Sequence, residues 1–171
     1  MELETGALSA KREQEIKSFL TERGLAIEGG ADYCAVLRDY DGRVGACGCL
    51  DGSVIKYVAV APFAEGEGAA ATIVSDLINY AYREGREHLF LFTKRDNETM
   101  FRSLGFYPVV RTADAVMLED RKDGIGRFIA SIPKAEGVKG ACVVNCDPFT
   151  RGHRYLIETA AANCDFLYVF V

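Results

Sequence analysis

The chain has 171 residues, of which 49% are hydrophobic and 26% charged, a balance typical of a globular protein rather than a disordered one. Its formal net charge of -5 and pI of about 5.1 argue against nucleic-acid binding through a broad basic face. No apolar run reaches the roughly 18 residues of a membrane-spanning helix. The N-terminus lacks the basic start of a secretion signal, so we expect a cytoplasmic protein without membrane or nucleic-acid partners. The sequence leaves homo-oligomer formation open.

The first 61 residues predict one helix followed by three antiparallel strands. Apolar residues spaced among charges over 10–25 indicate an amphipathic helix that ends near Gly24. The segments 32–38, 44–50 and 54–61 have strand patterns and are joined by turns rich in Asp and Gly. The third strand is mostly apolar, so we expect it at the centre of the sheet.

The following residues alternate between helices and strands up to a polar segment. The expected elements are helices at 70–82, 97–104 and 124–132, and strands at 87–93, 106–110 and 115–118. A new buried strand then begins at Gly140. We therefore expect a first domain at 1–133, a linker at 134–139 and a second domain at 140–171.

Six cysteines are present: Cys34, Cys47, Cys49, Cys142, Cys146 and Cys164. In a chain of this length without a secretion signal they do not predict a disulfide framework. Cys47 and Cys49 share one face of a predicted strand, but no second pair of metal ligands accompanies them. We therefore expect small buried thiols and no metal site.

The most informative stretch is NCDPFTRGHRYLIE, residues 145–158, which links the apolar strand 140–144 to a helix predicted over 155–162. Thr150, Gly152 and His153 lie where the helix opens. Free N–H groups and the positive end of the helix dipole make such a turn an anion site. Gly152 lets a phosphate approach the backbone, and His153 adds an imidazole beside it.

The stretch VAVAPFAEGEGAAATIVSDL, residues 58–77, resembles the acetyl-CoA-binding motif of the GNAT acetyltransferase superfamily. A helix that ends in Gly105-Phe106 resembles that family's second landmark. The resemblance implies an α/β fold with a mixed, mostly antiparallel sheet and flanking helices. It also implies a strand that splays from its neighbour to admit a pantetheine arm. The residues implied to bind CoA or a CoA-like group are Val58, Val60, Glu65, Gly66, Glu67, Gly68, Ala69 and Ala70.

Two positions depart from the GNAT pattern. Glu65 stands where the family has Arg or Gln, which places a carboxylate near the expected phosphates. Phe101 stands where many members have a Tyr that acts as a general acid, and phenylalanine has no proton to donate. A GNAT fold that serves only for recognition or packing therefore stays open.

The segment Asp147-Pro-Phe-Thr-Arg-Gly-His153 resembles the nucleotidylyltransferase signature His/Thr-x-Gly-His, especially in its phosphopantetheine adenylyltransferase form. This implies the first β-α-β of a Rossmann-like nucleotidylyltransferase domain that binds ATP, with Mg²⁺ for which the sequence shows no ligand motif. His153 and Thr150 would be catalytic. The implied ATP-binding residues are Asn145, Cys146, Asp147, Pro148, Phe149, Thr150, Gly152 and His153. The alternative is a turn and helix cap with a surface histidine.

The two motifs together resemble the [citrate (pro-3S)-lyase] ligase family along essentially the whole chain. That resemblance implies activation of acetate by ATP as acetyl-AMP and acetylation of the prosthetic-group thiol on the acyl carrier subunit of citrate lyase, with release of AMP and diphosphate. The segment 165–171 reads as a second parallel strand, and two strands with one helix cannot bury their faces. We therefore expect a truncated second domain and no ligase activity from this chain alone. An acetyl-CoA-dependent N-acetyltransferase and a non-catalytic docking module for the citrate lyase complex stay open.

Overall fold

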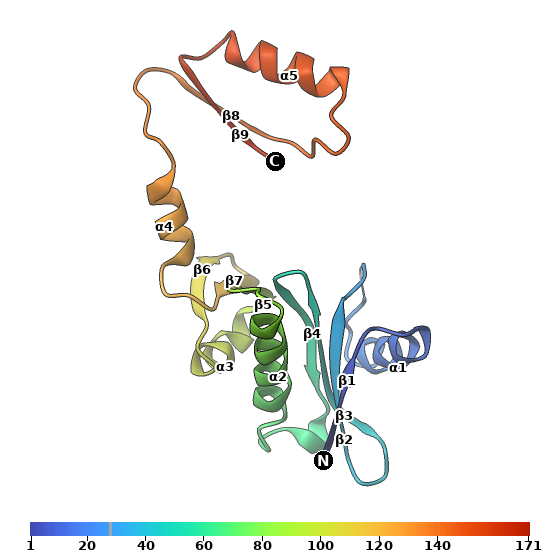
Figure 1. Cartoon of the computed structure of the whole chain (residues 1–171). Coiled ribbons are helices and arrows are strands. Elements are labelled where there is room, and N and C mark those ends of the chain that lie inside the picture. The colour runs from blue at the N-terminus through green and yellow to red at the C-terminus, as the bar shows by residue number, and fades with distance from the viewer. Residues whose placement is uncertain (28) are drawn as a thin grey trace. The chain divides into compact units, whose positions relative to one another are not determined.

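The computed structural model describes residues 1–27 and 29–171. They form two compact units, Met1–Gly126 and Arg127–Val171 (Figure 1). The domain limits expected at residues 133 and 139 stay a prediction. None of the helices in the described residues is long and apolar enough to cross a membrane.

The first unit is built on a seven-stranded sheet in the order β1-β2-β3-β4-β5-β7-β6. All neighbours in this sheet are antiparallel except β4 and β5, which are parallel. The mixed, mostly antiparallel sheet is thus confirmed, and the apolar β4 lies in the middle as its pattern predicted. The strands are β1 (Glu2–Gly6), β2 (Tyr33–Arg38), β3 (Val44–Asp51), β4 (Val54–Val60), β5 (Phe90–Lys94), β6 (Tyr107–Arg111) and β7 (Ala115–Glu119).

Helices cover both faces of this sheet. Residues of β2 alternate between two apolar clusters, which shows that the clusters lie on opposite faces. One cluster contains Ile73, Val74 and Leu77 of α2, and the other contains Ile16 and Leu20 of α1. The helices of this unit are α1 (Ala10–Thr21), α2 (Ala69–Arg83) and α3 (Glu98–Ser103), and α4 (Gly124–Ser131) begins in it (Figure 1).

Strand β1 was not expected from the sequence. It pairs antiparallel with β2, and the guanidinium of Arg38 in β2 lies 2.9 Å from the carboxylate of Glu4. The same guanidinium bonds the carboxylate of Glu15 in α1 at 2.6 Å, and this hydrogen bond lowers the pKa of Glu15. The sequence pattern of β1 is mostly polar, so the strand is held in place by its pairing with β2 and by Arg38, which binds both Glu4 and Glu15.

The expectation of free thiols was wrong for two of the six cysteines. Cys34 and Cys49 face each other directly across β2 and β3, with 4.1 Å between their Cα atoms, and they form a disulfide. The hairpin register brings them together. Cys47, Cys142, Cys146 and Cys164 are free, and Cys47 is buried.

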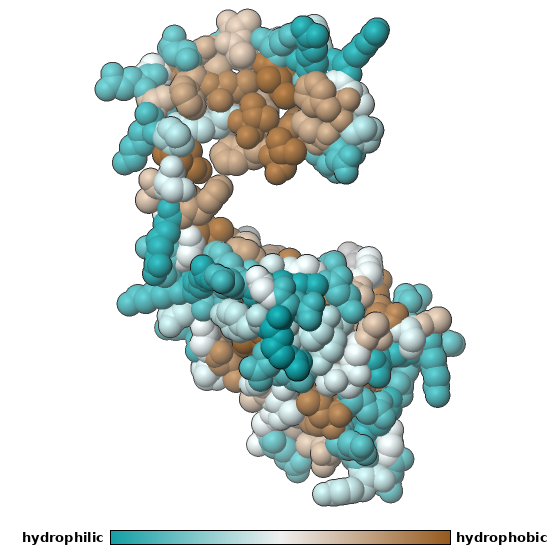
Figure 2. Space-filling model, viewed as in Figure 1, coloured by the Kyte–Doolittle hydropathy of each residue, from teal (hydrophilic) through white to brown (hydrophobic). Residues whose placement is uncertain are grey.

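The second unit contains a short parallel sheet of β8 (Lys139–Val143) and β9 (Phe166–Phe170), with α5 (Arg151–Ala161) between them in sequence and packed against both. This confirms the β-α-β order. No side chain of residues 127–171 is buried. Figure 2 shows hydrophobic surface on this unit. Among its large hydrophobic side chains, Val143 and Tyr155 are 84% and 73% exposed.

A buried carboxylate fixes the start of α4. Glu119, 3% exposed, accepts a hydrogen bond from the backbone N–H of Ile125 at 3.0 Å and lies 2.6 Å from Nε2 of His88. A Cβ on Gly124 would lie within 2.7 Å of both side chains, so only glycine fits there. The helix therefore begins at a position set by the first unit.

Candidate functional site

Strands β4 and β5 are neighbours only at their beginnings. Their pairing consists of Val54 with Phe90 and Ile55 with Leu91, and it ends there. Later residues of β4 still pair with β3 on the other side, up to Val60 with Ala46. The edges of β4 and β5 that face each other are thus open beyond Ile55 and Leu91.

A bulge in β4 lies where the two strands part. Cys47 pairs with Ala59 and Cys49 with Lys56, so two residues of β4, Tyr57 and Val58, stand opposite the single Gly48 of β3. Tyr57 has a φ of 58°, an uncommon conformation for a residue with a side chain. Such an extra residue bends the strand, which explains why β4 leaves β5.

Two small residues of β3 support this bulge. A Cβ on Gly48 would lie 2.5 Å from Cγ2 of Ile73, so the glycine lets α2 pack closely against the sheet. The thiol of Cys47 donates to the carbonyl of Tyr57 over 3.4 Å. Burial raises the pKa of Cys47 to about 12, so the thiol remains a protonated donor at neutral pH.

A groove of about 520 Å³ occupies the gap between the two strands. We call it the β4–β5 groove. Its walls come from both strands, from the segment after α1, from the region of α3 and from β7. The lining residues are Arg23, Leu25, Ala26, Val54, Ile55, Lys56, Tyr57, Val58, Leu91, Phe92, Thr93, Lys94, Asn97, Phe101 and Ala115.

The groove is lined by apolar, neutral polar and cationic side chains. Its charged lining residues are Arg23, Lys56 and Lys94, and none of its lining residues within the described chain is Asp, Glu, His or Cys. Lys56 pairs with Asp51, which raises the pKa of the lysine. Phe101 is 3% exposed and meets Phe106 edge to face, so the wall offers no proton donor at this position. Among the described residues, the lining therefore offers no carboxylate or histidine to accept a proton from an amine, and two of its cations, Arg23 and Lys56, pair with Glu22 and Asp51.

The turn between β4 and α2 holds most of the residues expected to bind CoA. Gly66 and Gly68 have φ values of 79° and 75°, and a Cβ at either position would meet nothing within 4 Å. Gly68 caps α2 without a side chain, and within residues 1–27 and 29–171 no acceptor bonds the amides of Ala69 and Ala70. Glu65 and Glu67 are exposed beside them. We call this turn the α2 corner.

Of the two valines expected to contact a pantetheine arm, only Val58 lines the groove. The carbonyl of Val60 accepts a hydrogen bond from Nε of Arg23 at 3.4 Å, which already engages one of the backbone groups expected to bind ligand. The structure thus places the predicted residues in two places, the groove wall and the α2 corner.

The second strand-to-helix turn, which we call the α5 corner, begins with an N-cap at Thr150. Its hydroxyl oxygen accepts from the backbone N–H of His153 at 3.4 Å, and its own N–H donates to Nδ1 of His153 at 3.1 Å. Because Nδ1 accepts, the proton of the neutral ring lies on Nε2. The histidine can therefore present an N–H donor outward while its other nitrogen holds the cap.

The backbone at the α5 corner is open. The amides of Arg151 and Gly152 have no acceptor among the described residues, and a Cβ on Gly152 would meet only Oγ1 of Thr150, at 3.6 Å. The helix begins at Arg151, four residues before the predicted start, because the cap extends it. This geometry can receive a phosphate group.

The remaining residues expected to bind ATP precede the cap. The backbone N–H of Asp147 donates to Oδ1 of Asn145 at 3.3 Å, and the peptide bond between Asp147 and Pro148 is cis. The exposed Phe149 ring lies 5.9 Å from the His153 ring, centroid to centroid. Cys146 is partly exposed. The predicted set therefore lies together in one turn.

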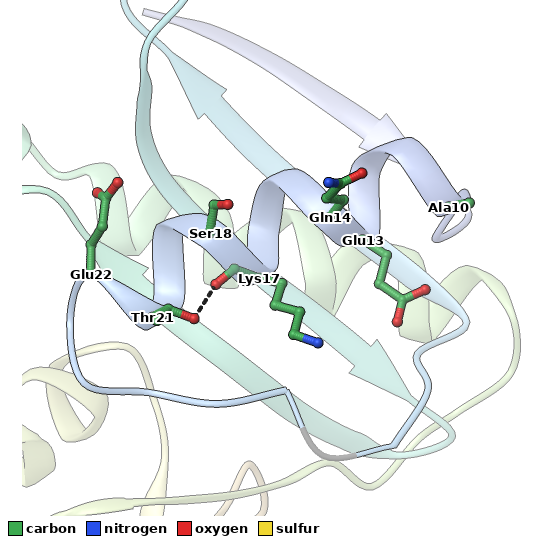
Figure 3. Close-up of a pocket in the computed structure, with 7 residues that line it drawn as sticks. All are labelled: Ala10, Glu13, Gln14, Lys17, Ser18, Thr21 and Glu22. Carbon is green, nitrogen blue, oxygen red and sulfur yellow. Dashed lines mark hydrogen bonds between the residues drawn. The ribbon is translucent and has the colours of Figure 1, made fainter.

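A larger hollow of about 770 Å³ lies over α1, but it does not bring together residues from different parts of the fold (Figure 3). All of its lining residues come from one helix, residues 10–22, and the only contact drawn between them joins Oγ1 of Thr21 to the carbonyl of Lys17 at 2.8 Å. Within residues 1–27 and 29–171, no group of three or more His, Cys, Asp or Glu side chains is placed to hold a metal ion.

Sequence reasoning missed several residues of the groove. Arg23 and Ala26 lie in the segment after α1, and Phe92, Lys94 and Ala115 come from the strands on its far side. No motif marks them, because they share only their position at the strand gap. The bulge at Tyr57 also left no pattern in the sequence.

Known proteins that are similar in sequence to this chain match residues in both units. The family model "Citrate lyase ligase C-terminal domain" matches residues 139–171. The [citrate [pro-3S]-lyase] ligase of Klebsiella pneumoniae is 37% identical over 164 residues, 94% of this chain and 48% of that protein. The enzyme of the same name from Escherichia coli K12 is 39% identical over 166 residues, 94% of this chain and 47% of that protein. The chain spans about half the length of these relatives.

Solved structures resemble the first unit in fold. Escherichia coli ElaA superposes with a TM-score of 0.61 at 16% identity, covering 71% of this chain and 100% of ElaA. An acyl-CoA N-acyltransferase from Pseudomonas aeruginosa gives a TM-score of 0.56 at 17% identity, covering 70% of this chain and 99% of that protein. The GNAT-like fold is thereby confirmed.

Proposed function

We propose that this chain, a homologue of the citrate lyase ligases along nearly its whole length, takes part in the ATP-dependent acetylation of a thiol on citrate lyase. In this reaction acetate is activated as acetyl-AMP, the acetyl group passes to the thiol of a CoA-like prosthetic group on the acyl carrier subunit, and AMP and diphosphate are released. The observation that carries the proposal is the 37% identity with the Klebsiella ligase over 94% of the chain.

In the second unit, the α5 corner would bind the phosphates of ATP. The open amides of Arg151 and Gly152 and the Nε2–H of His153 supply donors, and Thr150 holds the histidine in place. Such a site acts by positioning and by stabilising developing negative charge rather than by covalent chemistry. Mg²⁺ would arrive with ATP, since no cluster of metal ligands is present in the described residues.

In the first unit, the β4–β5 groove would receive the pantetheine part of the prosthetic group. Extended amides of such an arm can pair with the open strand edges, and apolar walls surround its carbon chain. An acetyl-CoA-dependent N-acetyltransferase needs a group that accepts a proton from the amine. Among the described residues, the groove lining contains no carboxylate or histidine, and Phe101 stands at the position of the expected acid, which supports recognition rather than transfer.

Filling the groove tests this assignment. Ala26 is exposed and lines the groove, so Ala26→Trp should place an indole in it with little effect on folding. Ala130→Trp, on the exposed face of α4, is the matched control. Isothermal titration of the full chain with pantetheine should show at least about tenfold weaker binding for Ala26→Trp alone. Unchanged affinity, or acetylation of an amine by acetyl-CoA in an acceptor screen, would contradict the proposal.

A further inference from the structure

One cation of the β4–β5 groove has no carboxylate partner among the described residues. The guanidinium of Arg23 pairs with Glu22 at 3.3 Å and donates to the carbonyl of Phe19. The ammonium of Lys56 pairs with Asp51. The ammonium of Lys94, the third charged lining residue, makes no ion pair or hydrogen bond with any residue in 1–27 or 29–171, and the residue is exposed. Its charge is therefore available to an anionic ligand.

Lys94 stands at the open end of the groove. The pairing of β4 with β5 ends at Ile55 and Leu91, and Lys94 is the last residue of β5, three positions further along the strand. At a rise of about 3.3 Å per residue, it lies roughly 10 Å from the last paired position. The closed end is lined by the buried, apolar Ile55 and Leu91. The two ends of the groove therefore differ in polarity.

The residues beside Lys94 add neutral donors. Nδ2 of Asn97 donates to Oγ1 of Thr93 at 3.0 Å, and both residues line the groove. Because that oxygen accepts, the hydroxyl of Thr93 and the second N–H of Asn97 can donate to a ligand. Asp96 and Asp114 are close in sequence and strand pairing, but neither lines the groove. One positive charge with neutral donors around it is a chemistry that binds phosphate.

We infer that Lys94 is a specificity-determining residue of the groove, which binds the phosphate that joins the pantetheine to the rest of the CoA-like group. The apolar closed end receives the thiol end of the arm, and the polar open end receives the phosphate. The groove thus recognises a phosphorylated pantetheine rather than pantetheine alone. The inference rests on the proposed function, because it specifies how the groove recognises the prosthetic group named there.

The test compares pantetheine with phosphopantetheine. Both are titrated into the full chain with saturating ATP present, so that the added phosphate does not occupy the α5 corner. The wild-type chain should bind phosphopantetheine more tightly. A phosphate of this kind carries about 1.5–2 negative charges at neutral pH, and a pair of opposite unit charges about 4 Å apart in water changes an affinity by about fivefold. Lys94→Gln should therefore weaken phosphopantetheine binding by roughly ten- to thirtyfold and leave pantetheine binding unchanged.

Two further variants show whether the effect belongs to the charge at this position. Lys94→Arg keeps the charge and should keep the preference for phosphopantetheine. Lys17→Gln removes the same charge from the exposed surface of α1, outside the groove lining, and should change neither affinity. Equal binding of the two ligands by the wild-type chain, or unweakened phosphopantetheine binding in Lys94→Gln, would overturn the inference while pantetheine binding still supported the groove. Failure of both ligands to bind would contradict the proposed arm site, and the inference with it.

Discussion

Substitution of Gly152 by alanine separates the stability of the α5 corner from its proposed role. The added Cβ meets only Oγ1 of Thr150, at the ordinary contact distance of 3.6 Å, and the φ of Gly152 is not in the left-handed region. Alanine is favoured over glycine within a helix by about 0.5–1 kcal/mol. In a domain of this size such a gain raises the melting temperature by about 1–4 °C. The variant should therefore be at least as stable as the wild type.

The same Cβ occupies space that a phosphate would use. Loss of one hydrogen bond to a charged group costs about 1.5–3 kcal/mol, which corresponds to at least about a tenfold weaker affinity. ATP titrated into Gly152→Ala should bind that much more weakly, while thermal melting shows no loss of stability. Gly30→Ala, at an open position without a positive φ, is the control and should change neither property. Wild-type ATP affinity in Gly152→Ala would refute the assignment of this corner to phosphates.

Two further predictions concern the sheet that frames the groove. Gly48→Ala places a Cβ 2.5 Å from Ile73, so overpacking should lower stability by about 1–3 kcal/mol in thermal melting, and a variant as stable as the wild type would contradict the close packing of α2. Iodoacetamide at pH 8 should modify the partly exposed cysteines of the second unit in the folded chain but spare Cys47, whose pKa burial raises to about 12. Mass spectrometry after denaturation without reductant should then find Cys34 and Cys49 still linked, and free thiols at both would show that no disulfide forms.

Much of the first unit follows from hydrophobic period and turn residues. The meander of β2, β3 and β4 and the position of α2 were predictable because short apolar runs are separated by turns rich in Asp and Gly, and because apolar residues recur at helical spacing after Gly68. Strand β1 was not predictable, because its sequence is mostly polar and it becomes a strand through its hydrogen bonds to β2. The hydrophobic pattern within a segment does not predict a strand that forms only by pairing with its neighbour.

The sequence analysis missed the disulfide and the true start of α5, for two different reasons. The separation of Cys34 and Cys49 by 15 residues means little alone, but a hairpin turn near Asp41 would have placed them in register. The helix was predicted to start at Tyr155 because apolar residues begin there, whereas the cap by Thr150 and His153 starts it at Arg151. The capping pattern of Thr150 and His153 is the sequence signal that would have placed the start of the helix correctly.

The candidate groove depended on the family resemblance rather than on pattern. A splayed strand was implied for the segment around Val58, yet the bulge that causes the splay arises from a mismatch in pairing between β3 and β4. Such a mismatch is a tertiary property. The cations and aromatic walls contributed by Arg23, Phe92 and Lys94 likewise become neighbours only after folding.

Hydrogen–deuterium exchange of the full chain with ATP and with pantetheine tests most directly whether two separate ligand sites exist. ATP should slow exchange in peptides that cover residues 147–154, and pantetheine should slow exchange over residues 54–58 and 91–94. Absence of ATP protection at 147–154, or pantetheine protection confined to other segments, would contradict the central claim that the α5 corner binds phosphates and the β4–β5 groove binds a thiol arm.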